Sequence, residues 1–508
     1  MSDSTVTTIV ASENLPYRFF GHPLGLATLF FTEMFERFSY YGMRALLVVF
    51  LSAAAVKGGL GLSDQQAGAI YGLYTAGAYL LCLPGGWIAD RLIGQRKSVV
   101  WGGVLIAAGN LLLSVPGGLG LVYCSLLLIA IGTGFLKTNA SCIVGELYKD
   151  DSGSRRDAAF SIYYFGINIG GTFGPLVAGT LGEVYGFRWC FFASGIAMLL
   201  GVVQYRVTAR WLGDAGLAPA PSSAAQRLHS KRLLLAGLVI TGVVVGAAAL
   251  GAFPLNVVQV AQLAGWLMVV LAVVFFGAVL VFGGLTSLER KRTAVIALFL
   301  VAAAVFWAGY EQAGSTLTLF AQDETDRSFL GSWFPSGQHP VSAYQIFQSV
   351  FVLMFAPVFA WLWLALGKRN RDPSASAKLG YGFLQLGASF AVMMIASKLV
   401  LATGHKVLPG WLIVTYLLQT TGELCLSPIG LSNVTKLAPP RYVSQMMGTW
   451  FLGAAIGNLA AGLIGGEIGS NVAVMPAQFL VMALVGGAAG VLLMLLAKPV
   501  QAWMGGVR

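Results

Sequence analysis

Four charged residues interrupt an apolar stretch near the start of the chain. In FTEMFERFSYYGMRALLVVF (31–50) they are Glu33, Glu36, Arg37 and Arg44. A charge at the centre of a bilayer costs about 2.5–3.5 kcal/mol, so such residues normally face a cavity and a partner. Each helical residue rotates by about 100°, which places the four side chains and Tyr40 within an arc of roughly 100°. The stripe predicts a polar interior lined by this helix, and a purely structural ion-pair network is the alternative.

Three further charges lie inside later apolar runs. Lys137 occurs in IGTGFLKTNASCIVGEL, Glu311 in FWAGYEQAGSTLTLF and Glu423 in LLQTTGELCLSPIGL. Acids therefore outnumber bases in the interior set. A buried carboxylate without a fixed partner tends to protonate, whereas arginine stays charged. The excess of acids predicts a cavity that binds protons.

The charge layout also restricts the substrate. Arg37 and Lys137, both in the first half of the chain, are suited to an anionic group, and Arg37 can bind one bidentately. Glu423, in the second half, is suited to an amine. The pattern predicts a solute with a carboxylate at one end and an ammonium at the other, and leaves peptides and other zwitterions both open.

The elements that position these charges are membrane helices. The chain has 508 residues, of which 57% are hydrophobic and only 10% charged, with a mean hydropathy of +0.77. Globular soluble proteins carry about 25% charged residues. The apolar runs reach roughly 20 residues, long enough to cross a hydrocarbon core of about 30 Å. Because the period-2 pattern of a β-barrel is absent, we expect an all-α polytopic membrane protein.

The net charge of +11 would suggest nucleic acid in a soluble protein. Here the basic residues fall in short loops, mostly in every second loop, as at 91–97, 227–232, 290–292 and 368–378. By the positive-inside rule, both termini are expected on the cytoplasmic side. Anionic headgroups of the bilayer account for the basic excess, so no nucleic-acid partner is expected.

About fourteen apolar runs are long enough to span. They lie near 25–54, 65–89, 97–116, 119–146, 157–182, 187–210, 232–253, 257–284, 293–320, 342–367, 378–402, 409–436, 443–466 and 474–498.

The runs divide the chain into two similar halves. We expect an N-terminal six-helix bundle at 1–210, a cytoplasmic linker at 211–231, two accessory helices at 232–288 and a C-terminal six-helix bundle at 289–508. The accessory pair is apolar throughout and offers nothing to a polar solute. Two six-helix bundles with a site between them at mid-membrane are typical of carriers. The loop GGWIADRLIGQRKS (85–98) resembles the loop signature of the major facilitator superfamily.

Several motifs of the chain resemble those of the proton-coupled oligopeptide transporters. FFGHPLGLATLFFTEMFERFSYYGMRALLVVFL matches the opening of that family, with its E-x-x-E-R-F-x-Y-Y motif at 33–41. Four later segments also match: FSIYYFGINIGGTFGPLVAG, FWAGYEQAGSTLTLFA, GELCLSPIGLSNVTKLAP and MGTWFLGAAIGN. The resemblance covers nearly the whole chain and implies a major facilitator fold that imports di- and tripeptides with protons.

The resemblance also implies roles for single residues. In proton coupling, Glu33, Glu36 and Arg37 would form a charged cluster, Lys137 would pair with Glu36, and Glu311 would pair with Arg44. In peptide binding, Lys137 would also hold the carboxylate and Glu423 the amino group. The rest of the substrate site would be Arg37, Tyr40, Tyr79, Asn168, Trp307, Gln348, Ser427 and Trp450. The aromatic and Asn168 side chains have a simpler reading as packing or interhelical contacts, and Ser427 as a partner for a backbone carbonyl next to Pro428.

Two positions depart from the family pattern. Gly72 stands where many animal members have a histidine, so proton coupling is expected to rest on carboxylates. In QIFQS (345–349), Gln348 replaces the asparagine that normally contacts the peptide amine, which bears on side-chain preference and affinity.

Other functions fit less well. A relative that carries nitrate or another organic ion would share the fold, but E-x-x-E-R, Lys137 and Glu423 favour peptides. An enzyme would need a nucleophile and base or a metal set, and no His/Cys/Asp cluster occurs at helical spacing. A sensor more often carries an extra soluble domain, and the loops are too short for one. We therefore expect a transporter, monomeric, in the inner (cytoplasmic) membrane, with no metal and no cofactor beyond the coupling proton.

Overall fold

The computed structural model describes residues 18–149, 154–217, 224–249, 256–369, 371–469 and 471–505. Its described part is almost entirely helical, as expected. The one sheet in that part is a pair of two-residue strands, β1 (Arg18–Phe19) and β2 (His22–Pro23), which leads into the first helix.

The first half begins with α1 (Leu24–Ser52), which carries the charged stripe. The remaining elements are η1 (Ala55–Lys57), α2 (Asp64–Leu80), α3 (Cys82–Ile88), η2 (Ala89–Ile93), α4 (Gln95–Ser114), α5 (Leu119–Glu146), α6 (Ser154–Phe173), η3 (Gly174–Gly179), α7 (Thr180–Tyr185), α8 (Phe187–Thr208) and η4 (Ala209–Leu212). Consecutive short elements such as α2, α3 and η2 form single irregular spans because no loop separates them.

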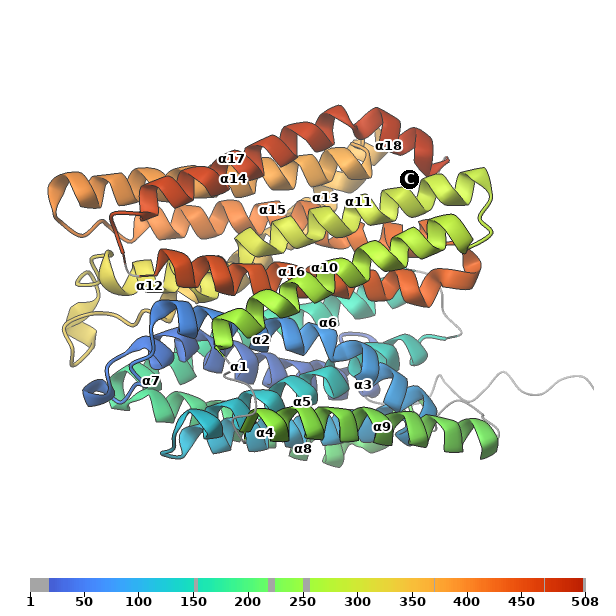
Figure 1. Ribbon diagram of the computed structural model, residues 1–508, viewed down its shortest axis with the longest axis horizontal. Coiled ribbons are helices and arrows are strands. Elements are labelled where there is room, and N and C mark those ends of the chain that lie inside the picture. Colours follow the sequence, from blue (N-terminus) through green and yellow to red (C-terminus); the bar gives the residue numbers. More distant parts are fainter. Residues whose placement is uncertain are drawn as a thin grey trace, which may run out of the picture.

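The middle of the chain holds α9 (Ala224–Ala249) and α10 (Val257–Phe282). α9 begins at Ala224, within the range 211–231 expected as linker, because Ala-Ala-Gln-Arg-Leu are good helix formers and extend the helix beyond its apolar part. α10 packs against α2, α11 and α16, and α9 contacts η2 (Figure 1).

The second half starts with α11 (Ser287–Tyr310), which opens with a capping box between Thr286 and Glu289. It continues with η5 (Glu311–Gly314), α12 (Thr316–Asp323), η6 (Gly331–Trp333), α13 (Ala343–Lys368), α14 (Ala375–Thr403), α15 (Gly410–Leu437), η7 (Pro440–Tyr442), α16 (Val443–Ile468), α17 (Met475–Leu495) and α18 (Ala497–Met504).

The two halves lie side by side, and the helix axes are roughly aligned with one another (Figure 1). α1, α4, α5, α6 and α8 pack together in the first half, and α11, α13, α14, α15, α16 and α17 in the second. Between the halves, α2 packs on α16 and α6 on α13. The α2–α16 contact is close because glycines face each other.

One of those glycines explains a departure noted in the sequence. A Cβ on Gly72 would lie 2.9 Å from the carbonyl oxygen of Leu459, so α16 leaves no room for a histidine side chain at position 72. The same holds for Gly68, whose Cβ would lie 2.3 Å from the carbonyl oxygen of Gly462.

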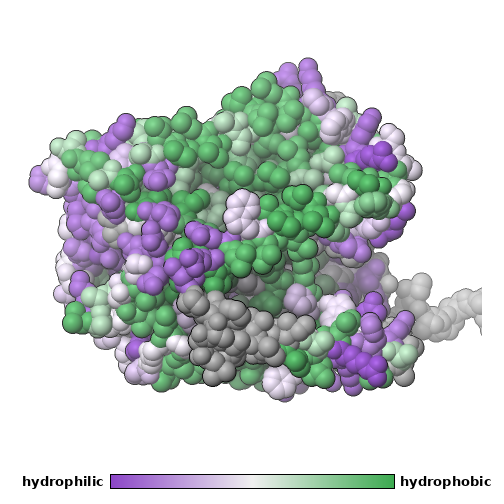
Figure 2. Space-filling model, in the orientation of Figure 1, coloured by the Kyte–Doolittle hydropathy of each residue, from purple (hydrophilic) through white to green (hydrophobic). Residues whose placement is uncertain are grey.

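The molecule is built to cross a membrane several times. Ten of the described helical segments are long and apolar enough to span one. α1 is not among them because its charged residues interrupt the apolar sequence. Hydrophobic side chains predominate over the middle of the visible face, and hydrophilic ones gather toward its two ends (Figure 2). The protein is therefore a multi-pass membrane protein with a helical fold.

Candidate functional site: a charged cavity between the halves

The charged residues of α1 form a compact buried cluster. Glu36 binds the guanidinium of Arg37 with both oxygens, one of them 2.6 Å from Nη2. Glu33 Oε1 lies 3.5 Å from Arg37 Nε, and its other oxygen accepts a hydrogen bond of 2.7 Å from the hydroxyl of Tyr163. The Arg37 guanidinium also lies 4.7 Å from the ring centroid of Tyr40. These contacts leave each charge with a partner.

Lys137 takes a different place from the one implied by the family resemblance. Its ammonium lies 4.2 Å from the ring centroid of Tyr79, and within the described residues no ion pair joins it to Glu36. The physical reason is that Arg37 occupies both oxygens of Glu36. Among the residues that the structure describes, the ammonium of Lys137 therefore has no ion-pair partner.

Arg44 and Glu311 form an ion pair between the two halves, as the resemblance implies. Arg44 Nη2 lies 2.5 Å from Glu311 Oε2, and Arg44 Nε donates to the hydroxyl of Tyr71 at 2.7 Å. Glu311 reaches this position because α11 ends at Tyr310 and the chain tightens into η5. Gly314 permits the approach, since a Cβ there would lie 2.0 Å from the Tyr71 hydroxyl.

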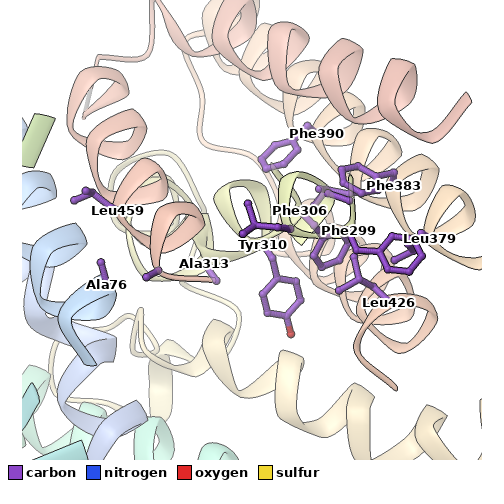
Figure 3. Close-up of a cluster of buried hydrophobic side chains, with 14 of the residues drawn as sticks. Ala76, Phe299, Phe306, Tyr310, Ala313, Leu379, Phe383, Phe390, Leu426 and Leu459 are labelled. Atoms are coloured by element: carbon purple, nitrogen blue, oxygen red, sulfur yellow. The ribbon is translucent and has the colours of Figure 1, made fainter. Parts of the chain in front are cut away.

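Glu423 on α15 is bound by a residue that the sequence analysis did not single out. The hydroxyl of Tyr310 donates a hydrogen bond to Glu423 Oε2. The ring of Tyr310 stacks on Phe306 and packs edge-on to Trp307. In Figure 3, this ring lies at the border of the buried cluster and its hydroxyl points away from the phenylalanines. Tyr310 is therefore held by the core of the second half while its hydroxyl orients Glu423.

Several of these groups line one cavity of about 210 Å³ between the halves. Its walls include several residues expected from the sequence: Glu33, Arg37, Tyr79, Lys137, Asn168, Trp307, Glu311, Gln348 and Glu423. They come from α1, α2, α5, α6, α11, η5, α13 and α15, so the fold brings together positions far apart in the chain.

Other expected residues lie elsewhere. Glu36, Tyr40 and Arg44 are buried behind the wall, next to the residues that line it. Trp450 packs against the hydrophobic core of the second half. Ser427 lies in α15 among the residues whose side chains are not described.

The cavity also has walls that sequence reasoning missed: Tyr41, Tyr164, Ile167, Tyr310, Ser349 and Val352. Two of them had a detectable signal. Tyr41 belongs to the same motif as Tyr40, and Tyr310 directly precedes Glu311. The others occupy helix faces that only the packing of α6 and α13 reveals.

Two hydrogen-bond donors of cavity-lining residues have no partner within the described part of the chain. They are Trp307 Nε1 and Gln348 Nε2. Because buried donors are nearly always satisfied, two free donors at a cavity wall are suited to the carbonyl groups of a bound ligand.

One end of the interface between the halves is closed by hydrogen bonds. The carboxylate of Glu183 on α7 accepts from the backbone N–H groups of Val341 (2.8 Å) and Ser342 (3.0 Å). Arg327 Nη1 lies 3.6 Å from the same carboxylate. We call this set the Glu183 latch. In the adjoining loop, burial and the nearby Arg327 lower the pKa of His339, so its imidazole is neutral near pH 7.

Comparisons with known proteins place the chain among transporters. A family model described as the POT family matches residues 96–470. The peptide transporter YePEPT of Yersinia enterocolitica is 40% identical over 459 residues, 89% of each chain. The di-/tripeptide transporter of Lactococcus lactis subsp. cremoris is 35% identical over 96% of this chain and 98% of that protein.

The similarity extends to three dimensions. A crystal structure of a peptide transporter, POT, in complex with sulfate superposes with a TM-score of 0.89 at 37% identity, covering 96% of this chain and 97% of that chain.

Within the described residues, no group of three or more His, Cys, Asp or Glu side chains could hold a metal ion.

Proposed function

This chain belongs to the POT family and is a transporter rather than an enzyme, and we propose that it imports di- and tripeptides with protons across the cytoplasmic membrane. No cofactor takes part in this scheme, and the proton is the coupling ion. Several relatives are named peptide transporters or di-/tripeptide permeases, which supports the substrate class.

The observation that carries the proposal is the two-sided charge of the cavity. Arg37 and Lys137 belong to the first half of the chain, and Glu423 to the second. A peptide has a carboxylate at one end and an ammonium at the other. Bound between the halves, it would place its carboxylate at the cations and its ammonium at Glu423. Binding would then draw the two halves together.

The free donors at the wall favour a peptide over a simple amino acid. Trp307 Nε1 and Gln348 Nε2 have no partner within the described residues, and an accept-only group such as a peptide carbonyl would satisfy them. The aromatic wall formed by Tyr41, Tyr79 and Tyr164 offers apolar contact that does not depend on one side-chain shape. Such a site would accept many dipeptides.

Protonation of Glu311 is the coupling step in our proposal. A protonated Glu311 no longer holds Arg44 by charge, so the ion pair between the halves weakens. Only a ligand that binds two states unequally shifts their balance, and a proton on Glu311 favours the state in which the pair is broken. The α1 cluster of Glu33, Glu36 and Arg37 is a second candidate for the protonation site.

Access would alternate by movement of the halves. We propose bundles at 1–210 and 289–508, a linker at 211–231 and accessory helices at 232–288, all in the inner membrane. The basic loops favour cytoplasmic termini, which places the Glu183 latch on the outer side. The described conformation would then be closed to the outside, and we propose that the monomer is the working unit.

Uptake by purified protein in liposomes tests the proposal. Radiolabelled dialanine should accumulate above its outside concentration when the outside is acidic, and should not when the pH is equal on both sides. Accumulation that ignores the pH gradient would contradict proton coupling, and failure of dialanine to bind or enter would contradict the substrate class.

A further inference from the structure

Another hollow lies on the lipid-facing surface of the second half, away from the charged cavity. This groove of about 590 Å³ is bounded by α13, α14 and α15. Its α13 wall is apolar and consists of Phe359, Leu362, Trp363 and Leu366. α13 exposes its apolar residues, including Trp361 (67%) and Leu364 (68%), so this surface faces the hydrocarbon of the membrane.

The depth of the groove matches one leaflet of a bilayer. From Phe359 to the end of α13 at Lys368 the helix rises about 14 Å. On α14, Gln385 lies ten residues after the first residue, Ala375, a rise of about 15 Å. Half of a hydrocarbon core is also about 15 Å thick. The groove therefore runs from the middle of the membrane to its surface.

The surface end of the groove is basic. The end of α13, the start of α14 and the loop between them carry four basic residues and one acid, Asp372. The basic residues are Lys368, Arg369, Arg371 and Lys378. Lys378 Nζ lies 2.8 Å from Asp372 Oδ1 and 4.6 Å from the ring centroid of Trp363. Arg371 lines the groove, and within the described residues its guanidinium has no ion pair. The groove is therefore apolar along its length and positively charged at its membrane-surface end.

We propose that this groove binds an anionic phospholipid, with an acyl chain along the α13 wall and the phosphate between Arg371 and Lys378. The proposal uses the orientation inferred above, in which the basic loops face the cytoplasm. Anionic lipids are enriched in that leaflet, and basic pockets between helices on that side bind their headgroups. A zwitterionic lipid would make the same apolar contacts, but its headgroup would not neutralise the basic residues at the surface end of the groove.

The lipid site is separate from the peptide site. α13 contributes Gln348, Ser349 and Val352 to the charged cavity, and Phe359 follows Val352 by seven residues, about two helical turns. Loss of lipid binding is therefore expected to leave dialanine binding intact. That separation provides a control for folding in each variant.

Native mass spectrometry of the full-length protein in detergent, titrated with phosphatidylglycerol or phosphatidylcholine of the same acyl chains, tests the proposal. We expect about tenfold tighter binding of phosphatidylglycerol, since each basic group near the surface contributes to headgroup binding. The double variant Arg371→Gln, Lys378→Gln should lose this preference. The matched double variant Lys231→Gln, Arg232→Gln, which removes two exposed cations from α9, should keep it.

Two further arms separate the possible sources of binding. Leu362→Trp narrows the apolar wall while the cations remain, and should weaken phosphatidylglycerol binding. Glycerol phosphate, a headgroup without chains, should not compete. Equal affinity for the two lipids, unchanged binding in the Arg371/Lys378 variant or in Leu362→Trp, or competition by glycerol phosphate would each overturn the proposal.

Discussion

The carboxylate of Glu311 lies 2.5 Å from the guanidinium of Arg44, and both side chains are almost fully buried where the two halves of the chain meet. Breaking a buried pair by removal of one charge typically costs about 3–5 kcal/mol, because the other charge is left without compensation. The pair is therefore strong enough to bias the equilibrium between two arrangements of the halves. Its carboxylate is also a group that a proton can neutralise.

Glu311→Gln should separate coupling from binding. The amide keeps the shape of the side chain but cannot release or take up a proton. We expect proton-driven accumulation of dialanine to fall about tenfold or more. A tenfold change corresponds to about 1.4 kcal/mol of free energy. Exchange of labelled for unlabelled dialanine should continue. Asp157→Asn, at an exposed site on α6, serves as the matched control and should retain accumulation. Wild-type accumulation in Glu311→Gln would exclude this residue as the coupling site.

Glu423→Gln tests the recognition of the peptide amine. The substitution removes the negative charge opposite Arg37 and Lys137 but leaves a group that Tyr310 can still contact. Hydrogen bonds to charged groups contribute about 1.5–3 kcal/mol, so the affinity for dialanine should fall at least about tenfold. N-acetyl-dialanine, which lacks the ammonium, should lose much less. Equal losses for both ligands, measured by competition binding, would argue against an amine role for Glu423.

Glu183→Gln should loosen the end of the interface that the Glu183 latch closes. The amide is a weaker acceptor for the Val341 and Ser342 N–H groups and does not pair with Arg327. A loss of about 1.5 kcal/mol would raise the population of the open arrangement about tenfold. Spin labels at Val56→Cys and Leu408→Cys, both exposed at this end, would report it as a population with a longer distance between the labels. An unchanged distance distribution would mean that the latch does not hold the halves together.

The loop beside the latch should weaken in acid because of His339. Burial and Arg327 lower the pKa of this imidazole, whose Nε2 lies 2.9 Å from the Tyr344 hydroxyl; Asp326 opposes the shift. Because the folded pKa is below the unfolded value of about 6.5, the unfolded state binds the proton more readily. The contribution of neutral His339 to stability is therefore complete above that value and is lost as the pH falls below it.

Thermal unfolding in detergent at about pH 8 and about pH 5 measures this effect. The wild-type Tm should fall more on acidification than that of His339→Asn, which retains a polar side chain but does not titrate. His405→Asn, at an exposed histidine of a neighbouring loop, should behave as the wild type. Identical falls in wild type and His339→Asn would contradict the assignment.

Much of the fold could be predicted because apolar runs of the right length have few alternatives in a membrane. The run expected at 119–146 coincides with α5, and the run at 257–284 with α10 to within two residues. Irregular backbone was not predicted. The break at η5 and the widened turn η3 interrupt apolar sequence without changing its hydropathy, so the pattern of hydrophobic residues does not reveal them.

The site was predicted where charge made it visible and missed where only packing determines it. Glu33, Arg37, Lys137, Glu311 and Glu423 could be found because an intramembrane charge needs a reason. Tyr164 was passed over because a tyrosine in an apolar helix is usually a packing residue. Only the packing of the helices shows that its side chain lines the cavity.

Entry of peptide and proton together is tested most directly by the internal pH of liposomes. Purified protein is placed in liposomes that enclose a pH-sensitive dye, and a potassium diffusion potential, negative inside, drives cations inward. Addition of dialanine outside should acidify the interior, and acidification should require both the peptide and the potential. Binding of dialanine without acidification would contradict proton-coupled import by this chain.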